Sequence, residues 1–257
     1  AKIIEAALVK DSSKEFSELT QEDLEKLTFL RIDEPIKDVS SVARFTQLDR
    51  LVIVNGQISD ATPLAKLENL EWISFENNQN LDLSPLASLN QLYRLSLTVK
   101  PELDLNIVVE LKQLKELWLD RNQLTDVSAL VKLVNLKELH LDYNLLTDIS
   151  ALAELKQLKN LNLTHNNLTD ISPLEGLMQL ETLCLAENKL TNVNALSGLS
   201  QLEDLNLEDN ELTNVSALAG LENLRTLRLV KNPGLSSGQL EEIHAALPKC
   251  EIFSFDA

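Results

Sequence analysis

Imidazole and carboxylate side chains gather in one short stretch of the chain. Glu138, His140 and Asp142 alternate along the sequence, and His165 follows in the next segment. An imidazole between carboxylates is a side-chain set used in general acid–base catalysis. His140, His165 and Asp142 are also residue types that bind zinc. Either chemistry requires these groups to converge in one site, so the elements that carry them decide the question.

Aromatic and basic side chains form a second set. The protein has two tryptophans, Trp72 and Trp118. Tryptophan, tyrosine and arginine are the residue types enriched where proteins bind one another. This set indicates recognition of a macromolecule rather than catalysis, if the fold exposes it.

The elements that position both sets come from a repeat. Asn122, Asn144, Asn166, Asn188, Asn210 and Asn232 are each 22 positions apart (144 − 122, and so on). The frame L-x-x-L-x-L-x-x-N recurs around each of them, followed by x-L after the first five, and L-x-x-L-x-L-x-x-N-x-L is the signature of leucine-rich repeats. Weaker copies begin at Leu27, Leu48, Leu70 and Leu92, with Gly56 and Lys100 in two of the asparagine slots. We expect about ten repeats between Leu27 and Leu235.

The repeat frame predicts an α/β leucine-rich-repeat solenoid. Each L-x-x-L-x-L segment is a short strand with its leucines on the core side, so the strands stack into a curved parallel sheet on a concave face. The asparagine amide is expected to satisfy backbone groups of its turn and of the neighbouring repeat. The return segments are too short for long helices, and Asp170 and Ser172 suit a capped 3₁₀ or irregular turn.

Caps account for the two ends of the chain. We expect a helical N-terminal cap over residues 1–26, repeats over 27–235 and a C-terminal cap over 236–257, which together make a single domain of residues 1–257. Ser236 and Gln239 form a capping box that starts the last helix, and Pro248 stops it. Cys250, Ile252 and Phe253 are predicted to finish the last repeat.

The residues between the strand leucines point away from the core and stack into rows. Both tryptophans fall in these rows, where the leucine core gives no structural reason for them. The predicted partner-binding residues lie on repeats two to six: Arg50, Trp72, Arg94, Glu116, Trp118, Asp120, Glu138, His140, Asp142 and Tyr143. The alternative is a solvated row of strand residues with no partner.

The same rows argue against chemistry at the histidines. His165 lies one repeat beyond His140 and is displaced along the strand, so the zinc ligands do not converge. The architecture closes no pocket, and no nucleophile is supplied in a dry site. Cys184 has no basic neighbour that would favour its thiolate, and it lies too far from Cys250 for a disulfide. We therefore expect no enzyme activity, no catalytic residue, no cofactor and no metal.

The 22-residue period with the motif D-[IV]-S-[AP]-L resembles bacterial internalin-like repeats. The motif stands at Asp126–Leu130, Asp148–Leu152 and Asp170–Leu174. The resemblance implies a secreted or surface protein that holds a protein partner on its concave sheet. A related repeat of the same length occurs in intracellular regulators of a protein phosphatase, so an intracellular scaffold is the alternative function. A glycan binder is a third possibility, since aromatic rings also stack on sugars.

Charge narrows the choice of partner. Asp and Glu number 40 against 23 Lys and Arg, a formal net charge of −17. A field of that sign repels phosphate backbones, so we expect no nucleic acid. The chain has no long apolar run, so we expect no membrane insertion. We predict a monomer that binds a protein partner. Basic patches on that partner would match the acidic chain best. The free cysteines favour a reducing compartment, whereas the resemblance favours export, and we place the protein outside the cytoplasm.

Overall fold

The computed structural model describes residues 20, 22, 25–78, 81–98 and 103–254. The chain divides into two compact units, Ala1–Asn122 and Gln123–Ala257. The predicted N-terminal helical cap of residues 1–26 falls almost entirely outside the described residues, as does Lys100. The single domain of residues 1–257 stays a prediction.

The first unit is a parallel sheet whose strands pair in chain order. Each strand pairs with the equivalent strand of the next repeat, so that Arg50, Trp72 and Arg94 are register partners. Its strands are β1 (Phe29–Ile32), β2 (Arg50–Val54), β3 (Trp72–Glu76), β4 (Arg94–Thr98) and β5 (Glu116–Trp118). Its 3₁₀ segments are η2 (Val42–Arg44), η3 (Thr62–Lys66), η4 (Ser84–Ser88) and η5 (Leu105–Val108).

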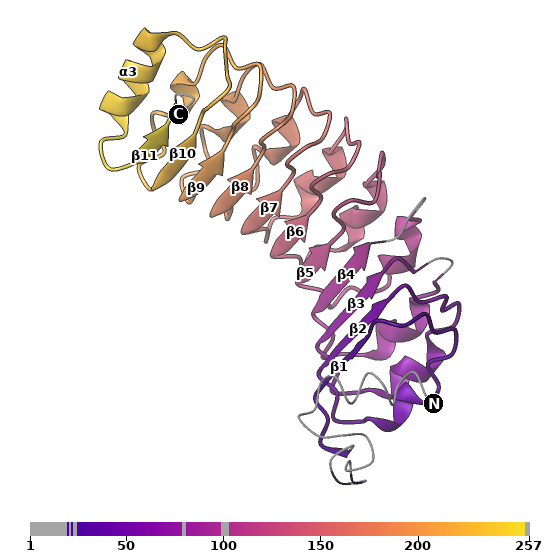
Figure 1. Cartoon of the computed structure of the whole chain (residues 1–257). Helices are drawn as coiled ribbons and strands as arrows, with labels where there is room; N and C mark the ends of the chain where they lie inside the picture. Colours follow the sequence, from indigo (N-terminus) through magenta and orange to yellow (C-terminus); the bar gives the residue numbers. More distant parts are fainter. Residues whose placement is uncertain (1–19, 21, 23–24, 79–80, 99–102, 255–257) are drawn as a thin grey trace. The chain divides into compact units, whose positions relative to one another are not determined.

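The second unit repeats this arrangement with shorter strands (Figure 1). Its strands are β6 (Glu138–His140), β7 (Asn160–Asn162), β8 (Thr182–Cys184), β9 (Asp204–Asn206), β10 (Thr226–Arg228) and β11 (Glu251–Phe253). Its 3₁₀ segments are η6 (Ser128–Lys132), η7 (Ser150–Glu154), η8 (Ser172–Leu174), η9 (Asn194–Leu196) and η10 (Ser216–Leu218). The helix α3 (Ser237–Ala246) stands in the place of a 3₁₀ segment between β10 and β11.

The core between strands and turns is aliphatic, as the repeat predicts. Most frame leucines are buried, for example Leu158, Leu161 and Leu163 at 0%, 1% and 0% exposure, whereas Leu27 and Leu235 at the two ends of the repeats are half-buried. Phe45 and Phe75 are the large aromatic exceptions, both fully buried in the first unit. Each repeat covers its neighbour's leucines, which no single repeat can do for itself.

The buried asparagines hold the repeats together as expected. Asn188 is typical: its amide nitrogen donates to the carbonyls of Leu163, Leu185 and Ala186 at 3.0, 3.1 and 3.1 Å. Its Oδ1 accepts from the backbone N–H of Leu168 at 3.0 Å. The prediction that this amide satisfies its own turn and the neighbouring repeat is confirmed.

The turn and cap chemistry is also confirmed. Asp170 Oδ1 accepts from the backbone N–H of Ser172 at 2.8 Å, and Oδ2 accepts from the Ser172 hydroxyl at 2.9 Å, where η8 begins. Ser236 and Gln239 form the capping box of α3, and the helix ends before Pro248. The strand β11 pairs with β10 and finishes the last repeat, as predicted. Of the two helical caps, the C-terminal one is therefore described.

Candidate functional site

The predicted outward rows exist in the first unit. Arg50, Trp72, Arg94 and Glu116 follow one another as register partners on β2 to β5. Trp118 lies two residues beyond Glu116, as the partner of Ser96 in the next row. These side chains are exposed or half-buried, whereas the leucines between them are buried. The parallel pairing thus brings side chains 22 residues apart in sequence onto one face.

Arg94 lies at the centre of this face. Its guanidinium carbon lies 4.5 Å from the ring centroid of Trp118 and 5.6 Å from that of Trp72. Both distances are within the range of cation–π attraction. Arg94 also forms a salt bridge with Glu116, with Nε donating to the carboxylate. We call Trp72, Arg94, Glu116 and Trp118 the tryptophan–arginine cluster.

The two tryptophans are half-buried, not fully exposed as the sequence suggests. The cause is the packing within the cluster, which shields part of each indole. Trp72 Nε1 is buried and has no hydrogen-bond partner among the described residues. A buried donor without an acceptor is uncommon and costs free energy, so it calls for a reason.

Two arginines that flank the cluster are paired with carboxylates. Arg50 lies 5.2 Å from the ring of Phe29, and its Nε donates to Asp49 at 3.1 Å. Arg31, which sequence reasoning did not select, donates to Asp33 at 2.7 Å and lies 3.6 Å from Glu76. Arg31, Arg50 and Arg94 are therefore each paired with a nearby carboxylate.

The second unit holds the acidic part of the prediction. His140 Nε2 lies 2.9 Å from Glu138 Oε1, and its Nδ1 lies 4.0 Å from Asp142 Oδ1. Asn162 donates its side-chain amide to Asp142 at 2.9 Å. These contacts fix the imidazole among carboxylates on an open face. Among the described residues, no group of three or more His, Cys, Asp or Glu side chains is placed to hold a metal ion.

Tyr143 lies three residues after the end of β6 (143 − 140), in a left-handed backbone conformation with φ of 54°. Its ring stacks on His165 with centroids 4.7 Å apart. His165 Nδ1 in turn lies 2.8 Å from Glu187 Oε2. His165 and Glu187 also have positive φ. Sequence reasoning missed this row because the position before each asparagine never carries glycine, the usual signal of a left-handed residue.

The ten predicted residues thus divide between the two units. Arg50, Trp72, Arg94, Glu116, Trp118 and Asp120 lie in the first, and Glu138, His140, Asp142 and Tyr143 lie in the second. Within each unit the structure brings them onto the outward strand rows or the adjoining turn.

The two cysteines are free, as expected. Burial, reinforced by Asp142 and Asp204, raises the pKa of the Cys184 thiol. Burial, with Asp204 and Glu251, raises the pKa of Cys250 to about 11. A raised pKa disfavours the thiolate, which is the reactive form. This agrees with the interpretation of Cys184 as inert.

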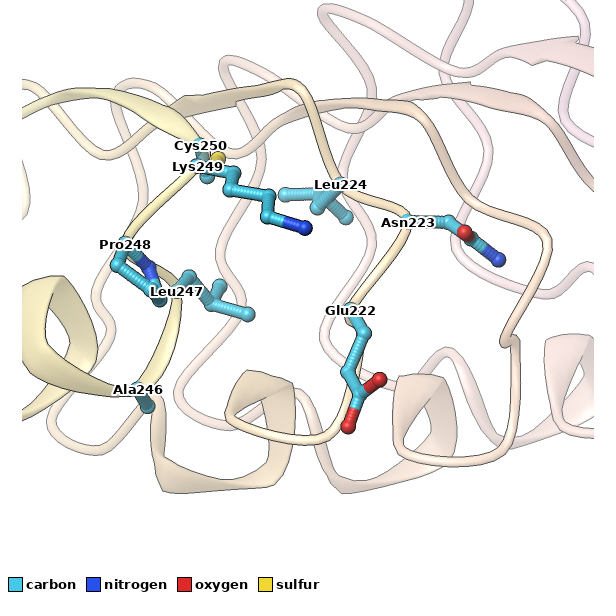
Figure 2. A pocket seen from close by; sticks show the side chains of 8 residues that line it. All are labelled: Glu222, Asn223, Leu224, Ala246, Leu247, Pro248, Lys249 and Cys250. Carbon is cyan, nitrogen blue, oxygen red and sulfur yellow. The ribbon is translucent and has the colours of Figure 1, made fainter.

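A pocket of about 400 Å³ opens beside the C-terminal cap (Figure 2). The register partners Thr226 and Glu251 are 25 residues apart (251 − 226), against 22 for Asp204 and Thr226 (226 − 204). The longer connection contains α3, which is bulkier than a 3₁₀ turn. The pocket lies between residues 246–250, which lead from the end of α3 to β11, and residues 222–224, which precede β10. Eight residues line it: Glu222, Asn223, Leu224, Ala246, Leu247, Pro248, Lys249 and Cys250.

Comparison with known proteins agrees with this architecture. A family model described as leucine rich repeats in two copies matches residues 112–154. A second, described as leucine rich repeat, matches residues 156–212 and 178–233. Repeat, fold and outward rows together are those of a leucine-rich-repeat protein. The sequence matches none of the curated proteins compared with it.

Solved structures refine the class. An internalin of Listeria monocytogenes, InlF, is 28% identical with a TM-score of 0.73, over 99% of this chain and 89% of its own. Internalin C2 of the same organism is 29% identical with a TM-score of 0.57, over 86% and 90%. The chain is an internalin-like leucine-rich-repeat protein. A TLR13 structure solved with a single-stranded RNA is 26% identical with a TM-score of 0.62, over 74% of this chain and 29% of its own.

Proposed function

We propose that this chain is a non-catalytic binding protein that holds a protein partner on the outward face of its sheet. The observation that carries the proposal is the tryptophan–arginine cluster. Both tryptophans of the protein stand on strand positions that face away from the leucine core. Tryptophan and arginine are the residue types that most often dominate the binding energy of protein interfaces.

The class of fold supports a binding role. Stacked repeats present an extended surface of strand side chains, which repeat proteins use for recognition. TLR13 was solved with RNA, but this chain carries a net charge of −17. Phosphate backbones are bound through Lys and Arg, and the arginines described above are already paired with carboxylates. A protein partner therefore fits better than a nucleic acid.

The likeness to internalins supports a secreted or cell-surface location, which we include in the proposal. The described residues contain no helix long and apolar enough to cross a membrane. We further propose that the chain acts as a monomer without a cofactor. Size-exclusion chromatography with light scattering checks the oligomeric state.

A pull-down with paired variants tests the proposal. The test variant carries Trp72→Ala and Trp118→Ala, and the control carries Val134→Ala and Met178→Ala. The control removes apolar side chains that are 47% and 54% exposed but lie outside the strand rows. We expect a partner from host or bacterial lysate to be retained by the wild type and the control and lost by the test variant. Equal capture by all three would contradict a site on the strand rows.

A further inference from the structure

We infer that Arg94, held by Glu116, is a positioning residue that sets the orientation of both tryptophans before a partner arrives. The inference rests on the proposed function, because it assigns a role inside the same site. It concerns the free protein, however, and is tested there without any partner.

Arg94 contacts both tryptophan rings through its guanidinium. Its guanidinium lies between two indoles that belong to different strands and different rows, Trp72 on β3 and Trp118 on β5. A guanidinium is planar and weakly hydrated, so it stacks on aromatic rings in a way that the ammonium of lysine does not reproduce. One side chain thereby restrains two rings that do not share a register pair.

Glu116 holds the guanidinium of Arg94 from the neighbouring strand. It is the register partner of Arg94 on the neighbouring strand, and its carboxylate binds the guanidinium from the side. The two side chains are 33% and 22% exposed, less than those of Arg50 and Asp49 at 51% and 39%. Partial burial weakens the competition from water and makes such a pair stronger than a fully exposed one. Glu116 therefore fixes the plane of the arginine that the rings contact.

The cluster is not arranged for the greatest stability of the isolated fold. It lies outside the leucine core, and it leaves Trp72 Nε1 buried without an acceptor among the described residues. An arrangement selected only for stability would hydrogen-bond that donor. Restraining two large aromatic side chains in advance reduces the entropy lost when a partner binds, which improves affinity without any new contact.

The protein provides a direct probe, because its only two tryptophans are both in the cluster. The tryptophan bands of the near-ultraviolet circular dichroism spectrum, and acrylamide quenching of tryptophan fluorescence, therefore report on this cluster, whereas the two tyrosines and six phenylalanines contribute at shorter wavelengths. The test variants are Glu116→Gln, which removes the charge, and Arg94→Lys, which keeps the charge but not the plane. The control is Glu203→Gln, which breaks a similar pair one repeat apart, Arg225 with Glu203 at 3.1 Å.

We expect both test variants to weaken the near-ultraviolet signal and to increase quenching, while the control matches the wild type. A cation–π contact at a partly exposed site corresponds to about a two- to five-fold change in the ratio of stacked to open rings. Arg94→Lys should not rescue the signal. Unchanged spectra in both test variants, with unfolding midpoints near that of the wild type, would overturn the inference.

A binding assay with a partner identified by pull-down separates this inference from the proposed function. If Trp72→Ala abolishes binding and Glu116→Gln weakens it several-fold, both hold. If Trp72→Ala abolishes binding while Glu116→Gln changes neither spectrum nor affinity, the positioning role fails and the proposed function stands. If the spectra change but neither variant alters binding, the cluster is positioned as described and the proposed site is wrong.

Discussion

The buried asparagines allow a sharp prediction about stability, because they do not all form the same hydrogen bonds. Asn188 both donates to carbonyls and accepts from the Leu168 N–H at 3.0 Å. Asn78 donates to Ile53 and Glu76 at 3.0 and 3.1 Å, but its Oδ1 has no partner among the described residues. Replacing each by alanine therefore removes different interactions from otherwise similar buried sites.

The magnitude follows from what each substitution leaves unpaired. In Asn188→Ala the carbonyls of Leu163 and Leu185 keep bonds from Asn166 and Asn210, each at 3.0 Å. The Leu168 N–H loses Asn188 Oδ1, the one acceptor that the described residues provide for it. An unsatisfied buried N–H costs about 1–3 kcal/mol and the lost hydrogen bonds about 1 kcal/mol more, so we expect a loss of about 2–4 kcal/mol. Asn78→Ala leaves no such buried N–H without its acceptor, and we expect a loss of about 1 kcal/mol in the free energy of unfolding.

Urea unfolding followed by far-ultraviolet circular dichroism measures both losses. Hydrogen exchange adds a local readout, because the Leu168 amide should exchange faster in Asn188→Ala than in the wild type. An equal or larger loss for Asn78→Ala, or a Leu168 amide that stays protected in Asn188→Ala, would refute the reasoning.

Three further predictions follow from single contacts. Gly56→Ala should destabilise the protein by about 1–3 kcal/mol in urea unfolding, because its Cβ would lie 2.1 Å from Asn78 Oδ1; a neutral effect would contradict this. The backbone N–H and hydroxyl of Ser172 lower the pKa of Asp170 below its ordinary 3.8. The ionised carboxylate therefore contributes to folding stability above pH 3.8, and this contribution is lost as pH falls through the lowered pKa. The melting temperature should thus fall less between pH 5 and pH 2 in Asp170→Asn than in the wild type, and parallel curves would argue against it. With a pKa of about 11, Cys250 is about one part in a thousand thiolate at pH 8; slow reaction with a disulfide reagent, faster at higher pH, is expected, and rapid labelling at pH 8 would not fit.

The repeat period fixes most of this fold because each leucine is defined by its copies. Leu161, Leu183 and Leu205 could be assigned to one core row without a structure, and the register confirms it. The same arithmetic placed Trp72 beside Arg94. The capping box of Ser236 and Gln239 could also be predicted, because its chemistry is local.

The remaining features depend on contacts that spacing does not encode. The stacking of Arg94 on Trp118 crosses from one row to another, so it depends on side-chain rotamers. The left-handed backbone of Tyr143 and His165 is imposed by the turn that the buried asparagine closes, at positions without glycine. The pocket beside Lys249 arises from the three extra residues of the last connection, whose effect depends on the width of α3.

The site on the first unit's outward face is tested most directly by photo-crosslinking. A photoreactive amino acid at Ser96, the register partner of Trp118 on β4, leaves both tryptophans in place. The same group at Met178, which is 54% exposed and lies outside the strand rows, serves as the control. We predict a discrete protein adduct from position 96 that disappears when Trp72 and Trp118 are replaced by alanine, and no such adduct from position 178. An adduct from position 178 alone, or one from position 96 that survives loss of both tryptophans, would contradict the account.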